Sequence, residues 1–204
     1  MTYTPNSHYS MFLDYFGQTH TFQTFDDKIR NKKLIKQLHG TIEEHFDELA
    51  ELNSKGAGVY FTVNKTDLCG RSRKNITDVR AVFIDLDGTP LPTKFDVIPN
   101  IVVNTSRNKF HCYWIVKDMP LESFELYQEA LATKFNSDPK VKDLPRVMRV
   151  AGFYHHKKNP YPVKIIQCTA HEPYTMKEIR DGLRLVRPER KVVKHDPSIY
   201  QGQY

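Results

Sequence analysis

The chain has few of the features that would place a protein outside the cell or in a membrane. Its three cysteines, Cys69, Cys112 and Cys168, form no C-x-x-C pair. That spacing argues against a cysteine zinc site and favours a reducing compartment. No run approaches the roughly 18 apolar residues of a membrane span, and the start MTYTPNSHYS lacks the layout of a signal peptide. We therefore expect a cytoplasmic protein with no membrane contact.

Two further absences concern function. No G-x-x-x-x-G-K-[ST] phosphate loop occurs, so these residues hold no helicase motor, and no internal repeat is present. Acidic residues are outnumbered, with 24 of them against 30 lysines and arginines in a chain of 204. A net charge of +6 suits a polyanionic partner, but it also serves solubility alone.

The hydrophobic pattern predicts an α+β protein. Helix signals precede a series of strands, and one long amphipathic helix lies among them. Capping-box patterns at Thr41 and Glu44, and again at Thr175 and Glu178, mark two helix starts. The expected helices span residues 26–39, 41–52 and 120–136, and a last one begins at Thr175. The expected strands span residues 59–63, 82–85, 101–105, 110–116 and 163–167. Residues 137–162 are expected to be irregular. We expect a mostly antiparallel sheet crossed by the long helix.

The stretch VFIDLDGTPL, residues 82–91, allows two interpretations. It imitates the first motif of haloacid dehalogenase-like phosphatases, IVVNTS imitates their second, and Asp138 and Asp143 could supply their late acids. That family needs a parallel sheet, whose crossovers take about a dozen or more residues and are usually helical. The 13 residues 88–100 include three prolines and cannot form such a helix. The spacing therefore argues against the phosphatase.

The second interpretation is a metal-holding carboxylate pair. Residues i and i+2 of a strand point to the same side, so Asp85 and Asp87 project together while Leu86 turns away. Two adjacent carboxylates repel each other, and a divalent cation relieves that repulsion. Mg²⁺ prefers one or two carboxylates plus substrate phosphates, and two ions can clamp an in-line displacement. A merely solvated strand end remains the alternative.

Cationic and hydrogen-bonding residues follow the pair. The segment 104–114 contributes one group of them and the segment 142–157 another, which also holds a third acid. Arginine suits phosphate because its planar fork donates two parallel hydrogen bonds. A structural histidine and a basic surface loop remain the alternatives. The residues are Ser106, Arg107, Lys109 and His111, then Asp143, Arg146, Arg149 and Lys157.

The order of these motifs resembles the archaeo-eukaryotic primase superfamily. D-x-D on a strand is followed by S-x-x-x-x-H, by D-x-x-R-x-x-R-x-x-G and by H-x-K. The resemblance spans roughly residues 56–166 and is strongest to plasmid and phage replication primases. It departs at Ala151, where the family often has proline. The resemblance implies a helical and stranded N-terminal unit beside a mostly antiparallel sheet like that of an RNA-recognition module, flanked by helices.

The resemblance also implies residue roles and an activity. It implies a DNA primase or primase-polymerase that makes short oligonucleotides on single-stranded DNA from nucleoside triphosphates, with Mg²⁺ or Mn²⁺. Asp85, Asp87 and Asp143 would hold the metal and carry catalysis. Nucleotide binding would fall to Ser106, Arg107, Lys109, His111, Arg146, Arg149 and Lys157. Separately, we expect the basic cluster Arg71, Arg73 and Lys74 to bind template.

We expect a catalytic domain over 1–171 and a C-terminal helix with a basic tail over 172–204. That ending suggests a linker to further domains, so a replicative helicase, separate or fused, is the additional partner expected. A non-catalytic single-strand or origin-binding module is the main alternative function, although it leaves the three acids unexplained. A rolling-circle nicking enzyme needs two histidines flanking one hydrophobic residue, and FHCYW supplies one.

Overall fold

Two four-stranded sheets organise residues 8–29 and 31–186, the part of the chain that our computed structural model describes. All neighbouring strands within each sheet pair antiparallel. The first sheet has the order β2 (Gln37–Gly40), β1 (His20–Asp26), β3 (Ala57–Thr62), β9 (Val147–Arg149). The second has the order β12 (Lys164–Cys168), β7 (Ile101–Ser106), β8 (Lys109–Ile115), β6 (Ala81–Asp87). An antiparallel sheet confirms the expected α+β class and is not the sheet of the phosphatase.

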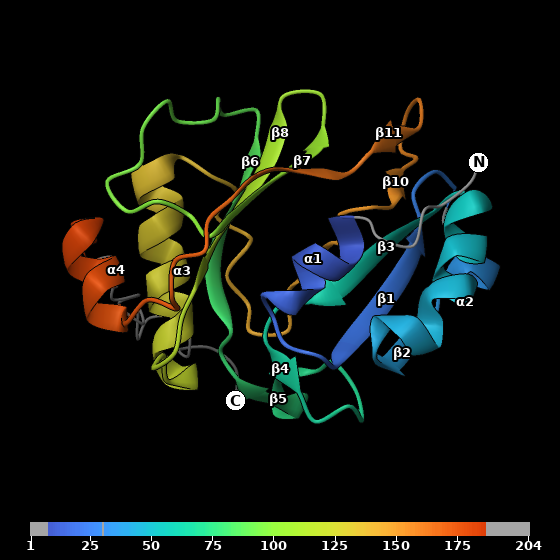
Figure 1. The fold of residues 1–204 in the computed structure, drawn as a ribbon, viewed down its shortest axis with the longest axis horizontal. Helices are drawn as coiled ribbons and strands as arrows, with labels where there is room; N and C mark the ends of the chain where they lie inside the picture. Colours follow the sequence, from blue (N-terminus) through green and yellow to red (C-terminus); the bar gives the residue numbers. More distant parts are fainter. Residues whose placement is uncertain (1–7, 30, 187–204) are drawn as a thin grey trace, which may run out of the picture.

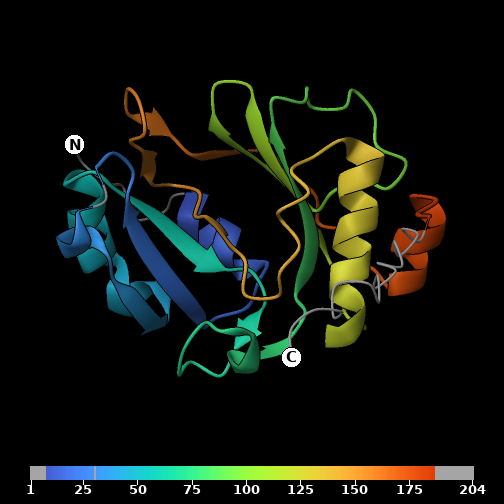
Figure 2. The same cartoon turned by 180° about the vertical axis from the view of Figure 1, so that it is seen from behind.

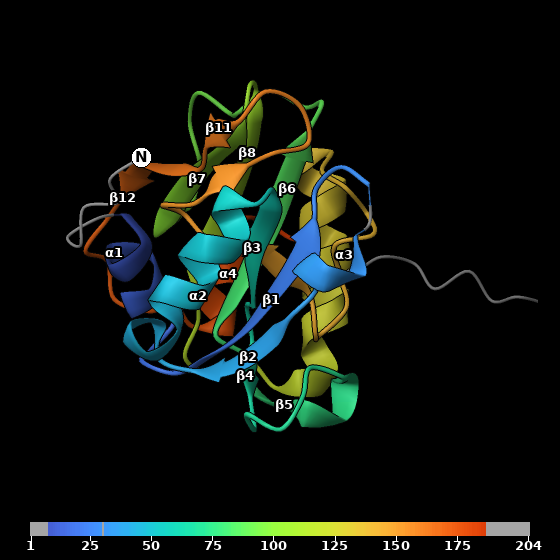
Figure 3. The same ribbon diagram turned by 90° about the vertical axis from the view of Figure 1, so that its right-hand side faces the viewer.

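Within the described residues, two short hairpins and four α-helices accompany the sheets. Helix α2 covers the outer face of the first sheet and α3 that of the second, with α4 beside α3 and α1 between the two halves (Figure 1). Figure 3, a side view, has α2 in front and α3 behind, with both sheets between them. The helices are α1 (His8–Asp14), α2 (Ile42–Ser54), α3 (Leu121–Phe135) and α4 (Met176–Gly182), and the hairpins pair β4 (Lys65–Thr66) with β5 (Ile76–Asp78) and β10 (Tyr154–His155) with β11 (Tyr161–Pro162).

Aromatic rings of α1 and of the turn that follows it join the two sheets into one core. Phe12 and Phe16 both contact Phe61 of β3, with ring centroids 5.2 and 4.8 Å apart. The same two rings contact Tyr113 of β8 at 5.7 and 5.4 Å. Offset and edge-to-face aromatic contacts at such distances stabilise beyond their area burial. The two sheets are therefore held at a fixed distance along the line where they meet.

The edge strand β6 is closed by a buried glutamine of α3. The Gln128 side chain accepts from the backbone N–H of Phe83 and donates to its carbonyl, both at 3.0 Å. It also donates to the carbonyl of Val141 at 3.0 Å. An unpaired strand edge would otherwise leave buried backbone groups without partners. One side chain thus satisfies the backbone groups of Phe83 on this edge and ties the segment after α3 to β6.

The helix-start predictions are confirmed, and one helix prediction is wrong. Both capping boxes form, at Thr41 with Glu44 and at Thr175 with Glu178. Residues 26–39, expected as a helix, instead contain the end of β1, a 3₁₀ turn (Lys32–Leu34) and most of β2. The Asp26 carboxylate accepts three backbone N–H groups of the following turn, which ends β1 there. Helix α1 and strand β1 were not expected at all.

The C-terminal helix shares the main core. Ile179 and Leu183 are fully buried, and the Tyr174 N–H donates to the carbonyl of Ile115 at 2.8 Å. The expected basic tail falls mostly on residues 187–204, which lie outside the described residues, so the division at 171 stays a prediction. Among the described residues, no helix has the length and apolar character needed to cross a bilayer.

Candidate active site

A cavity of about 230 Å³ opens between the two sheets, and we call it the central cavity. Its walls come from β3 and β9 of the first sheet, from β6, β7 and β8 of the second, and from the segment that follows α3. Figure 2 shows that segment running down between the two sheets. The polar residues of its lining are Tyr60, Asp85, Asp87, Thr105, Lys109, His111, Asp138, Arg146, Arg149, His155 and Lys157.

Asp85 and Asp87 both line the central cavity, as the period of a strand predicts. Leu86 between them is fully buried on the other face of β6. The register of β6 with β8 sets Asp85 opposite His111 and Asp87 opposite Lys109. Lys109 Nζ lies 2.5 Å from Asp87 Oδ1, and His111 Nε2 lies 3.8 Å from Asp85 Oδ1. Each carboxylate therefore faces a basic side chain of the neighbouring strand β8.

His111 is a buried, neutral hydrogen-bonding group. Burial lowers the pKa of His111, and the opposing influence of the Asp85 carboxylate does not reverse this. Its Nδ1 shares a hydrogen bond of 3.1 Å with the Tyr113 hydroxyl, which fixes the ring. At neutral pH the side chain therefore presents hydrogen-bonding capacity to the cavity without adding positive charge.

The segment after α3 brings Asp138, not Asp143, to the central cavity. The Asp138 N–H donates to the Asp85 carbonyl at 3.1 Å, and Asp138 is part of the cavity wall. The Asp143 carboxylate forms an ion pair with Arg146 and acts electrostatically on Arg71. Asp143 is not among the lining residues. The metal-binding role of Asp143 stays a prediction, and the geometry gives Asp138 the better position for a third acid.

The acids fit a cation shared with a substrate, not one enclosed by protein. Within residues 8–29 and 31–186, no group of three histidine, cysteine, aspartate or glutamate side chains is clustered tightly enough to hold a metal. Mg²⁺ and Mn²⁺ accept oxygen ligands in octahedral geometry, and Mg²⁺ usually takes one or two carboxylates together with substrate phosphates. Asp85 and Asp87, on one face of one strand, supply that kind of donor set.

Cationic side chains form the wall opposite the acids. Arg149 of β9 and Arg146 just before β9 line the central cavity together with Lys157. His155, which sequence reasoning did not single out, lies beside them and donates from Nδ1 to the Thr105 carbonyl at 3.1 Å. Burial, followed by the charge of Arg149, lowers the pKa of His155. The wall therefore combines fixed positive charges with a neutral imidazole.

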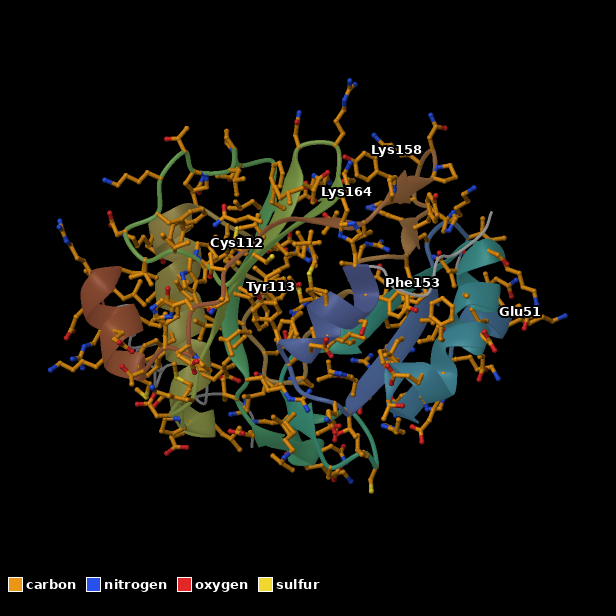
Figure 4. The ribbon with its side chains drawn as sticks, viewed as in Figure 1. Glu51, Cys112, Tyr113, Phe153, Lys158 and Lys164 are labelled. Atoms are coloured by element: carbon orange, nitrogen blue, oxygen red, sulfur yellow. The ribbon has the colours of Figure 1, made fainter. Side chains whose placement is uncertain are left out.

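A second depression, which we call the outer groove, continues from the central cavity. Its volume is about 610 Å³, and it lies between the β7–β8 turn and the β10–β11 hairpin. Lys158, which Figure 4 labels at this end of the molecule, belongs to it. Four of its residues are cationic and none is acidic. The lining residues are Ser106, Arg107, Lys109, His155, Lys157, Lys158, Asn159 and Tyr161.

The predicted template cluster is separate from both depressions. Arg71 donates from Nε to Gln23 Oε1 at 2.9 Å, and Arg73 pairs with Glu125 of α3. Neither arginine, nor Lys74, lines the central cavity or the outer groove. The β4–β5 hairpin that carries them is at the opposite end of the molecule from the β10–β11 hairpin (Figure 1). Their template-binding role stays a prediction.

Sequence reasoning missed Thr105, Asp138 and His155 as cavity residues. His155 stands in the H-x-K pattern, but it reaches the cavity only because β10 crosses the end of β7. Asp138 is one of two acids five residues apart, and a motif alone does not tell which one faces the strand pair. Only the path of the backbone after α3 separates them.

Comparisons with known proteins agree with this fold. The model of the RepB DNA-primase N-terminal domain matches residues 74–191, more than half of the chain. A "Replication protein" of Clostridium perfringens is 27% identical over 204 residues, covering 85% of this chain and 48% of the relative. The chain therefore spans about half the length of that curated relative.

Solved structures share the architecture at low sequence identity. The AEP domain of the primase-polymerase of cyanophage S-2L has a TM-score of 0.69 at 19% identity, covering 86% of this chain and 96% of that one. Primase RepB' gives 0.64 at 18% identity, with 87% and 60% covered. Its catalytic domain in complex with initiator DNA gives 0.59 at 18%, with 84% and 87% covered. The chain has the primase fold of plasmid and phage replication, and it belongs to the RepB DNA-primase N-terminal domain family.

Proposed function

We propose that this chain is a template-directed nucleotidyltransferase, a DNA primase or primase-polymerase that builds short oligonucleotides on single-stranded DNA. The observation that carries the proposal is the central cavity. There the acids of β6 face Arg149 of β9 and Arg146, which lies just before β9. Bare carboxylates repel nucleic acid, so a pure DNA-binding surface has no use for them. The names of the proteins with this fold, a primase and a primase-polymerase, support the same reaction.

Asp85 and Asp87 are the proposed holders of Mg²⁺ or Mn²⁺, and Asp138 is proposed to join them only when the cation and substrate phosphates complete the site. When bound there, such ions supply positive charge to the reacting phosphate and to the departing pyrophosphate. Asp143 is the sequence-predicted third acid, and its ion pair with Arg146 supports a role through that arginine instead. The reaction forms one bond from a 3′-hydroxyl oxygen to the α-phosphorus, breaks the bond to the β-phosphate oxygen, and releases pyrophosphate and a proton.

The cationic wall, together with Lys109 beside the acids, is proposed to bind and orient the triphosphate. Arg146, Arg149, Lys109 and Lys157 supply donors that stay fixed while negative charge shifts toward the pyrophosphate. His111 is neutral and hydrogen-bonded to Tyr113, so we assign it to orienting the nucleotide and not to neutralising charge. These residues bring the reacting atoms together and exclude water around them.

The outer groove is the proposed path of the DNA strand. It is continuous with the central cavity through Lys109, His155 and Lys157, and the Arg107 and Lys158 cations lie further out. A strand lying there would place its end at the acids. Tyr161 lines the same groove and offers a ring on which a base can stack.

Salt dependence of DNA binding tests this path. Replacing Arg107 and Lys158 together by alanine should reduce the slope of log affinity against log salt by about 1.4, because each phosphate of a single strand that a cation neutralises contributes about 0.7 to that slope. Affinity is measured by fluorescence anisotropy of a labelled single strand. The matched control removes Arg73 and Lys74. A slope change confined to that control would support the template path predicted from the sequence and contradict the groove.

A non-catalytic strand-binding module is the second candidate, and the basic outer groove favours it. Calorimetry with a nucleoside triphosphate separates the two functions. The proposed enzyme should bind the triphosphate at least about tenfold more tightly with Mn²⁺ than without it, because the acids otherwise repel the phosphates. Equal binding with and without the metal would favour the strand-binding module.

A further inference from the structure

A buried ion pair lies directly behind the cationic wall. Asp27 follows β1, and only 4% of its side chain is exposed. Its two carboxylate oxygens accept from Arg149 Nη1 at 3.0 Å and from Nη2 at 2.7 Å. This two-point contact fixes both the position and the plane of the guanidinium. Arg149 has five N–H donors, of which this contact uses two, and the same side chain lines the central cavity.

Tyr60 completes the support of the guanidinium from β3. The Arg149 Cζ lies 4.6 Å from the centre of the Tyr60 ring, as the pairing of β3 with β9 dictates. The Tyr60 hydroxyl donates to Asp27 Oδ1 at 3.3 Å. The arginine is therefore held edge-on by a carboxylate and face-on by an aromatic ring, which leaves it little freedom to rotate.

Asp27 also fixes the other element of the wall. The backbone N–H of His156 donates to Asp27 Oδ2 at 2.8 Å. His156 lies between His155 and Lys157, which both line the central cavity. One carboxylate just after β1 thus anchors β9 and the residue that follows β10, and the distance between Arg149 and Lys157 depends on it.

The backbone next to this pair leaves no room for a side chain. A Cβ added at Gly58 would lie 2.5 Å from Arg149 Nη1 and 2.7 Å from Asp27 Oδ1. Stability alone does not account for the arrangement, because the cost of burying two charges largely offsets their attraction. What the arrangement provides is a defined direction for Arg149.

We propose that Asp27 is a positioning residue that aims Arg149 and the 155–157 segment at the triphosphate of the incoming nucleotide. The inference rests on the proposed function and adds a residue that touches no substrate itself. Asp27 acts through the orientation of donors, so it affects recognition of the β- and γ-phosphates more than recognition of the base and sugar.

The test compares the affinities of Asp27→Asn and wild type for a nucleoside triphosphate and for the matching monophosphate, both with Mn²⁺. Triphosphate affinity should fall about 10- to 100-fold, the value of one charged hydrogen bond. Monophosphate affinity should fall less than about threefold. A purely structural role would lower both equally. Asp26→Asn is the matched control, because the neighbouring Asp26 carboxylate only caps a turn.

Gly58→Ala tests the positioning role of Asp27 if Asp27→Asn proves too unstable to assay. Its methyl group would press on both Arg149 Nη1 and the Asp27 carboxylate, so it displaces the pair without removing any charge and should reproduce the selective loss of triphosphate affinity. Unchanged selectivity in Gly58→Ala, or in a folded Asp27→Asn, would overturn the positioning role. A wild-type protein that binds no triphosphate with metal would instead overturn the proposed function.

Discussion

Replacing Asp85 and Asp87 together by alanine should abolish oligonucleotide synthesis while the protein stays folded. The carboxylates are the proposed holders of the catalytic cations, whose charge stabilises the transition state by several kcal/mol. Since 1.36 kcal/mol corresponds to a factor of ten in rate, we expect a loss of at least about 10³-fold. The rate is measured with labelled nucleotides on a single-stranded template.

The fold should tolerate this double change. The Asp87 side chain is 54% exposed, and its pairing with Lys109 is a solvent-accessible contact of small energetic value. Removing two like charges from one strand end also relieves repulsion. Asp96→Ala is the matched control, because Asp96 also pairs with a lysine, Lys134, but lies outside the central cavity. Synthesis at the wild-type rate by the double variant would refute the assignment of the acids.

Asp138→Asn should lower synthesis far more than Asp143→Asn. Asp138 lies in the cavity wall beside Asp85, whereas Asp143 is occupied by Arg146. Loss of a carboxylate that helps to hold a cation against the reacting phosphates should cost about 10²-fold or more in rate. Asp143→Asn releases one partner of an exposed ion pair, so its effect should stay within about tenfold.

The two variants are matched in chemistry and separated by only five positions of one loop. Each is assayed under the same template and metal conditions, and the melting temperature of each checks that the fold is retained. A large loss with Asp143→Asn and a small one with Asp138→Asn would reverse the geometric interpretation. It would also restore the third acid that the sequence motif predicts.

The sequence predicts the positions of Asp85 and Asp87 well, because they depend only on neighbouring residues of one strand. The period of two along β6 requires Asp85 and Asp87 to share a face whatever surrounds them. The capping boxes at Thr41 and Thr175 are likewise decided within four residues of sequence. Such features need no knowledge of distant contacts.

The error at residues 26–39 has a tertiary cause. Two apolar residues of the segment, Ile29 and Ile35, are exposed, so the segment has no helical core face that includes them. What decides the segment is pairing with β1, where Leu38 lies opposite Phe22. Strand pairing across a turn is a non-local gain that helical periodicity does not report.

The positions of Asp27 and Asp138, by contrast, depend on contacts between distant parts of the chain. Asp27 and Arg149 are 122 positions apart, and no local pattern marks the aspartate. Asp138 reaches β6 because Gln128 and the backbone hold the segment after α3 against the strand edge. Motifs therefore predict which chemistry is present, while packing decides which of two similar residues performs it.

Sizing the products made on single-stranded DNA tests the central claim most directly. The protein is incubated with template, labelled nucleoside triphosphates and Mg²⁺ or Mn²⁺, and the products are separated by length. The account predicts short oligonucleotides that require both template and metal and that are absent with the Asp85→Ala, Asp87→Ala variant. A folded wild-type protein that binds the template yet forms no product with either metal would contradict it.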